Sequence, residues 1–312
     1  LRLSTTASNN TAVGKSALAA NTTGANNVAI GSLTLDAATT ATGNTAVGQG
    51  SMSATTTGAS NVAMGLSSLY TNTTGANNTA LGYSSMFANT TASNNTAVGY
   101  ASLTANTTGD RNVAVGTEAL DANTTSDGNT AVGYRALTTN TTAEINTAIG
   151  FQALNLNTTG GSNTALGANS LYSNTTASNN TAVGTSALTA NTTGYLNTAV
   201  GALALDANIT GVANTAVGYN ALSAATGDGA TAVGKDALEL NTSGVNTAVG
   251  SNALATVTTG TFNVAMGNDA LTLNTGSSNT AVGYGSLAAN TTGVNMTAVG
   301  YNAGLSHTTG NS

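Results

Sequence analysis

The sequence predicts an all-β protein, a parallel β-solenoid of about eighteen rungs that winds a seventeen-residue repeat. A unit that reads Asn-Thr-Ala-Val-Gly-x-x-Ala-Leu-x-x-Asn-Thr-Thr-Gly-x-x runs from Asn10 to the end of the 312-residue chain. Apolar residues recur at every second position in the first part of the unit, which is the period of a β-strand. The chain contains no proline, a residue that would remove a backbone donor from stacked strands.

The repeat accounts for all but the first nine residues. Residues 1–9 form a partial first rung, in which Leu1 and Leu3 take positions nine and eleven, and residues 10–312 form eighteen units of sixteen or seventeen residues. In the three short units the deletion falls in or just after the Thr-Thr-Gly segment, which predicts a surface turn there. Stacked units are stabilised by their neighbours rather than by separate cores, so we expect one elongated domain over residues 1–312.

Each unit is expected to hold two short strands. Position three is always Ala and position five is always Gly, while positions two and four alternate across the Ala, as a strand requires. Valine replaces the position-two threonine in four units, which suggests a packed site. A second apolar pair at positions nine and eleven, such as Leu154 with Leu156, indicates the second strand. Helix is disfavoured because Thr, Asn and Gly are poor helix formers.

Stacking places like residues over like residues, about 4.8 Å apart. Positions one and twelve become Asn ladders, in which side-chain amides bond from rung to rung. Position six is expected to form a partial aromatic ladder of Tyr83, Tyr100, Tyr134, Phe151, Tyr219, Tyr284 and Tyr301.

The invariant alanines, from Ala12 to Ala298, are expected to face another copy of the molecule, where a larger side chain would hold the two backbones apart. A coil of seventeen residues encloses little volume, so association would add the stability that a single copy lacks. The alternative is that alanine fits a narrow interior.

Composition excludes several partners. Charged residues make up 5% of the chain and the formal net charge is −6, so no basic stripe exists to neutralise nucleic-acid phosphates. No run of about eighteen apolar residues occurs, so we expect no membrane insertion in this segment. The chain opens at Leu1 in mid-rung and closes on a whole unit without polar caps. We therefore expect a segment of a longer protein, or a rod that also joins end to end.

The Asn-Thr-Ala-Val-Gly-x-x-Ala-Leu and Asn-Val-Ala-Ile-Gly segments resemble the head repeats of YadA-like trimeric autotransporter adhesins. The Thr-Thr-Gly-x-x-Asn-Thr-Ala connection resembles repeats of bacteriophage tail fibres that end in an endosialidase-type chaperone domain. The resemblance covers nearly the whole chain. It implies a left-handed β-roll, a homotrimer, an extracellular, cell-surface or virion location, and contact with a host-surface or matrix glycan or protein.

Little in the sequence points to catalysis, and we expect neither an enzyme nor a cofactor site. The single histidine, His307, lies in the last unit, and three aspartates at a spacing of 85 residues would stand roughly 24 Å apart, too far to share acid–base work. These are Asp36, Asp121 and Asp206.

The best polar cluster lies at position sixteen of three successive rungs. A Ca²⁺ site is one hypothesis for this cluster, and solvated turn residues near Arg111 are the alternative that we favour. Glu118 and Arg135 occupy position seven of adjacent rungs and predict a cross-rung ion pair. The candidate metal ligands are Asp110, Asp127 and Glu144.

These patterns favour a non-catalytic structural or adhesive shaft of an extracellular fibre, and an end-to-end filament is a variant of this hypothesis. Ice binding is the alternative, because flat threonine-rich solenoid faces can order water. Against it, the paired threonines of each unit, such as Thr22 and Thr23, are adjacent and lie in a turn. A solenoid polysaccharide lyase is disfavoured, because no cluster of carboxylate, lysine and arginine lies along one face.

Overall fold

The computed structural model describes residues 5–310, and within them it contains eighteen three-residue β-strands, one for each rung. The expectations for Leu1 and Leu3 lie outside the described residues. The strands are β1 (Thr11–Val13), β2 (Val28–Ile30), β3 (Thr45–Val47), β4 (Val62–Met64), β5 (Thr79–Leu81), β6 (Thr96–Val98), β7 (Val113–Val115), β8 (Thr130–Val132), β9 (Thr147–Ile149), β10 (Thr164–Leu166), β11 (Thr181–Val183), β12 (Thr198–Val200), β13 (Thr215–Val217), β14 (Thr231–Val233), β15 (Thr247–Val249), β16 (Val264–Met266), β17 (Thr280–Val282) and β18 (Thr297–Val299).

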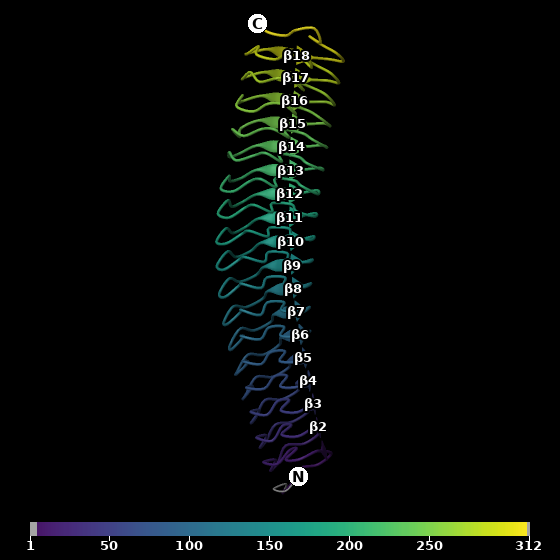
Figure 1. Ribbon diagram of the computed structural model, residues 1–312, viewed down its shortest axis with the longest axis vertical. Coiled ribbons are helices and arrows are strands. Elements are labelled where there is room, and N and C mark those ends of the chain that lie inside the picture. Colours follow the sequence, from purple (N-terminus) through teal and green to yellow (C-terminus); the bar gives the residue numbers. More distant parts are fainter. Residues whose placement is uncertain (1–4, 311–312) are drawn as a thin grey trace. The chain divides into compact units, whose positions relative to one another are not determined.

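The chain divides into two compact units, Leu1–Thr159 with β1–β9 and Gly160–Ser312 with β10–β18. Within each unit every strand pairs in parallel with the next, as the stacked arrows of Figure 1 show. The register joins equivalent residues, so that Ala114 pairs with Ala131 in one unit and Ala199 with Ala216 in the other. The predicted parallel β-solenoid with a seventeen-residue repeat is therefore confirmed. The single-domain organisation stays a prediction.

The residues of each unit determine both the extended conformation of the strand and the point at which it ends. Threonine and valine are β-branched and favour extended backbone. The glycine at position five ends the strand with a positive φ, +137° at Gly116. A Cβ on Gly116 would lie 2.4 Å from the carbonyl oxygen of Gly133 in the next rung, so only glycine fits where the two backbones approach.

The interior is narrow and is filled by small side chains. The position-three alanines from Ala29 to Ala281 are fully buried within the single chain, so the expectation that they face another copy is wrong and the narrow-interior alternative is correct. Each rung except the last adds one larger core residue at position nine, such as Leu120 or Met86. Because alanine takes the inner side of the strand, positions two and four point outward. The inference of a packed site from the valines at position two is therefore also wrong for the single chain.

The second strand expected at positions nine and eleven does not form. Leu120, like the other leucines at position nine, has a left-handed backbone with φ near +52°, and position seven is left-handed as well, as at Glu118. Two such residues break the extended conformation, although backbone bonds still join the rungs here, for example from the Leu120 amide to the Ala136 carbonyl. A left-handed leucine costs about 1–2 kcal/mol, which burial of its side chain, worth about 1.5–3 kcal/mol, offsets.

Both predicted Asn ladders are confirmed. At position one, the backbone amide of Asn61 donates to Oδ1 of Asn44 at 2.9 Å, and Nδ2 of Asn61 donates to the carbonyl of Gly75, fourteen residues further along the chain in the Thr-Thr-Gly turn. At position twelve, Nδ2 of Asn106 donates to Oδ1 of Asn89 at 3.2 Å. These amides satisfy buried backbone groups that the short strands leave unpaired.

Candidate interaction surface on the outward strand face

The outer side of the strands carries a regular, partly apolar surface in each unit. We call it the strand face, and it consists of the side chains at positions two and four, the first and third residues of each strand. Position two is Thr or Val and position four is Val, Ile, Leu or Met, and none of the eighteen strands contains a charged residue. Met64 is 46% exposed and Leu166 is 44% exposed. Each unit thus presents an uncharged, partly apolar face to its surroundings.

A column of left-handed residues lies along one edge of the strand face. This leading column stands two residues before each strand, and every member has φ between +45° and +72°. Asparagine, glycine and serine suit this conformation and fill most of the column. Bulky apolar residues take their place in a few rungs and are strongly exposed, with Phe262 65% and Leu196 55% accessible. The bulky apolar members are Ile145, Leu196, Val245 and Phe262.

The aromatic ladder lies along the opposite edge, in a trailing column that stands two residues after each strand. Stacking is confirmed for Tyr83 with Tyr100, whose ring centroids are 5.5 Å apart, for Tyr134 with Phe151 and for Tyr284 with Tyr301. These rings stack on one another, so they present edges and hydroxyls outward rather than flat faces.

Sequence reasoning missed a further stacked pair, Tyr70 with Phe87 at position ten, with centroids 5.2 Å apart. The seventeen-residue separation of these two residues was the signal that could have revealed it.

Two of the three candidate calcium ligands are engaged by other groups. Oδ1 of Asp110 accepts the Ser93 amide, Oδ1 of Asp127 accepts the Asp110 amide, and Oδ2 of Asp127 is 3.0 Å from Nη2 of Arg111. Glu144 is exposed in the next rung. Across residues 5–310 no three His, Cys, Asp or Glu side chains gather closely enough to hold a metal ion. The alternative hypothesis of turn residues with Arg111 nearby fits this arrangement.

The predicted ion pair between Glu118 and Arg135 is confirmed, with Oε2 and Nε 2.5 Å apart, and the hydrogen bond that Arg135 donates to this carboxylate raises the pKa of Arg135. The Arg135 guanidinium also lies 5.3 Å from the centre of the Tyr134 ring. Nearby, burial first and the Glu118 carboxylate second raise the pKa of Asp121 to about 6. Oδ1 of Asp121 is buried and accepts no hydrogen bond from the described residues.

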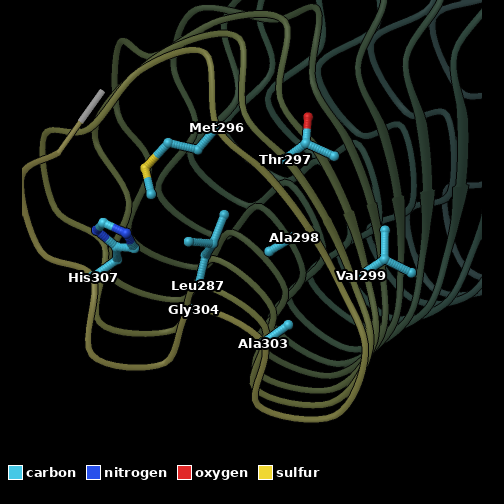
Figure 2. Close-up of a pocket in the computed structure, with 8 residues that line it drawn as sticks. All are labelled: Leu287, Met296, Thr297, Ala298, Val299, Ala303, Gly304 and His307. Carbon is cyan, nitrogen blue, oxygen red and sulfur yellow. The ribbon is translucent and has the colours of Figure 1, made fainter. Parts of the chain in front are cut away.

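A cavity of about 360 Å³ lies at the last rung, as Figure 2 shows. It opens where Gly304 replaces the core leucine of other rungs, so Leu287 and Ala298 of the interior line it together with Met296 and His307. His307 is the only titratable side chain in the lining. The cavity therefore assembles no nucleophile with a base and an orienting group.

In the described part of the chain no helix has the length and apolar character that crossing a bilayer requires. No protein-family model matches the chain, and no curated protein matches its sequence significantly.

Proposed function

We propose that this chain is a non-catalytic structural or adhesive shaft of an extracellular fibre, in which copies of the chain associate through their strand faces. One observation carries the proposal. The strand face is regular, uncharged and apolar at position four, and within residues 5–310 its side chains stay partly or fully accessible. Continuous exposed apolar surfaces of this kind mark interaction sites in soluble proteins.

A second copy is the partner that fits this face best. The face has no charge with which to select a charged partner, and its repeat of one rung matches the same repeat on another copy. Within one unit of nine strands it measures about 10 Å by 38 Å from strand dimensions, or about 380 Å². Aliphatic side chains at position four would interdigitate across such an interface as they do in a protein core.

The resemblance to adhesin heads and tail-fibre repeats supports a homotrimer in an extracellular, cell-surface or virion setting. In that arrangement the turns at Thr-Thr-Gly stay on the outside and would meet a host-surface or matrix glycan or protein. A low density of charge and long polar ladders suit a spacer whose length grows by whole rungs.

Sedimentation equilibrium of the purified chain tests the association. We expect an oligomer of three copies at micromolar concentration, and a monomer at all concentrations would refute the proposal. Electron microscopy separates discrete rods from an end-to-end filament, because only the filament gives particles longer than one chain.

A pair of matched variants locates the contact. Val115→Glu with Val132→Glu places two charges on the strand face in adjacent rungs, and we expect dissociation because buried unpaired charge is strongly unfavourable. Thr125→Glu with Thr142→Glu adds the same charges to exposed turn residues of the same rungs and is expected to leave the oligomer intact.

Ice binding is retained as a second candidate because of one observation. The first residue of fourteen of the eighteen strands is threonine, and it points outward from a registered sheet, so a regular threonine column does exist on the strand rather than in the turn. Thermal hysteresis of the purified protein would support this candidate, and its absence at high concentration would remove it.

A further inference from the structure

The strand face of one chain has about the area of a standard interface. It measures about 380 Å² in each unit, or about 760 Å² for the two units of one chain, against the roughly 800 Å² that each partner typically buries in a stable complex. The leading and trailing columns extend the face by two residues on each side, to at most about 20 Å in width. The contacts of these columns therefore add to the area and can give the association its specificity.

The two columns are complementary in size in fourteen of the eighteen rungs, and three of the other four rungs pair two small residues. Of the eleven rungs with a long side chain in the trailing column, ten have Gly, Ala, Ser or Asn in the leading column. In the second unit Ala213 accompanies Tyr219 and Gly229 accompanies Lys235. Conversely, Leu196 accompanies Ala202. The one rung in which both members are large holds Ile145 and Phe151.

This relationship does not arise from contact within one chain. The two columns lie beyond opposite ends of the strand, six residues apart along the chain, with the three strand residues between them. Bends at the leading residue and at the position-five glycine keep their separation below the roughly 20 Å of a fully extended segment. Members of the leading column bond along their own column, as the Phe262 amide does to the Val245 carbonyl. Members of the trailing column likewise stack along theirs, as Tyr284 does on Tyr301.

The bulky members of the leading column also carry a conformational cost that the fold does not require. Phe262 and Leu196 hold a left-handed backbone, at φ of +60° and +59°, where asparagine or glycine serves in other rungs. Their side chains lie in solvent in the single chain. A residue that combines a strained backbone conformation with an exposed apolar side chain indicates a contact outside the chain.

We infer that the leading column of one copy packs against the trailing column of the next copy at the same rung, and that this contact fixes the copies parallel and in axial register. The inference rests on the proposed self-association. In a closed ring of parallel copies, the leading edge of one face meets the trailing edge of its neighbour. The strands themselves repeat about every 4.8 Å and would accept a slip of one rung almost equally well. The side chains of the leading and trailing columns differ in size from rung to rung, so a slip of one rung would mismatch them.

Disulfide trapping tests the inference, because the chain contains no cysteine. The variant Val245→Cys with Ser251→Cys places one cysteine in the leading column and one in the trailing column of the same rung. Val245→Cys with Ala202→Cys is the matched control, in which the trailing cysteine lies three rungs away, about 14 Å along the stack. Cysteines whose Cα atoms are more than about 7 Å apart do not bridge, so neither pair closes within one chain or out of register.

After mild oxidation we expect at least about ten-fold more covalently linked oligomer from the same-rung pair than from the control, since only that pair meets disulfide geometry. Equal linkage of the two pairs would overturn the inference. So would no linkage of either pair while sedimentation still gives an oligomer, and that result would leave the proposed association standing. A monomer in sedimentation would instead refute the association, and the register contact with it.

Discussion

Oγ of Ser53 donates a 2.6 Å hydrogen bond to Oδ1 of Asp36 across one rung, and Ser223 repeats this bond to Asp206. Asp121 occupies the equivalent position five rungs from each of these aspartates, but the following rung offers Thr138 in place of serine. The Thr138 hydroxyl donates to the Glu118 carbonyl instead, at 3.1 Å. One substitution thus accounts for the missing partner of Oδ1 of Asp121.

Thr138→Ser should supply the missing donor. We expect the serine hydroxyl to turn toward Asp121, to lower the pKa of that carboxyl, and to stabilise the rung by about 1 kcal/mol at neutral pH. Carboxyl titration by NMR measures the pKa, with Thr104→Ser, in the preceding rung, as the control. An unchanged Asp121 pKa in the Thr138→Ser variant would contradict this account.

The raised pKa of Asp121 predicts a dependence of stability on pH. The folded-state pKa of about 6 lies above the reference value of 3.8, so the folded chain binds more protons than the unfolded chain between these values. The free energy of unfolding should therefore be higher below about pH 4 and fall by roughly 1–2 kcal/mol as the pH rises through about 6, after allowance for solvent screening.

Urea midpoints measured across this pH range, compared between the natural chain and Asp121→Asn, isolate the contribution of this carboxyl from that of the others. Parallel pH profiles for the two proteins would show that Asp121 titrates normally.

The sequence predicted the rungs and ladders but not which side of the strand faces inward. The alternation of Val113 and Val115 with Ala114 shows that the strand has two different sides, but it does not show which side is buried. The same alternating pattern results whether the alanine or the valines face the interior. The interior is too thin for two rows of large side chains, so the invariant alanine takes the inner side. The leucines at position nine were not predicted to be left-handed, because leucine rarely adopts that conformation outside a site that buries it.

The candidate surface was only partly predictable. The aromatic stacks followed from the seventeen-residue spacing, as for Tyr83 and Tyr100. The leading column did not, because its members look like ordinary loop residues until the backbone places them along one edge of the strand face. Asp110 and Asp127 stood out as acidic residues in the sequence, whereas their bonds to backbone amides depend on the stacking geometry.

Interior and exterior positions of the same strand should respond differently to substitution. Ala114→Ile adds volume to a fully buried site and is expected to destabilise the fold by about 1–3 kcal/mol. Val115→Ser changes an outward side chain and should leave the fold intact while weakening association. Circular dichroism and sedimentation together distinguish the two effects. A variant Ala114→Ile that folds normally but fails to associate would restore the view that alanine faces another copy.

The role of Asp110 as an acceptor predicts how it tolerates change. Asp110→Asn keeps an oxygen for the Ser93 amide and should be nearly neutral, whereas Asp110→Ala leaves that amide without its acceptor and should cost about 1–2 kcal/mol. Thermal melts with and without a chelator complete the test, and we expect the same melting temperature in both. A drop in melting temperature on chelation would revive the calcium hypothesis.

Exchanging the sizes of Ala213 and Tyr219 tests the edge contact by a route that needs no cysteine. Ala213→Phe places two large side chains at the same rung, and we expect weaker association, because neighbouring copies would be held apart. Adding Tyr219→Ala restores the small and large pair in the opposite order and should recover association. The two residues lie beyond opposite ends of β13 within one chain, so recovery in the double variant would require contact between copies. Sedimentation of the two single variants and the double variant gives the coupling free energy between Ala213 and Tyr219 in association. If the effects of the two substitutions on association are additive, the two columns do not contact each other.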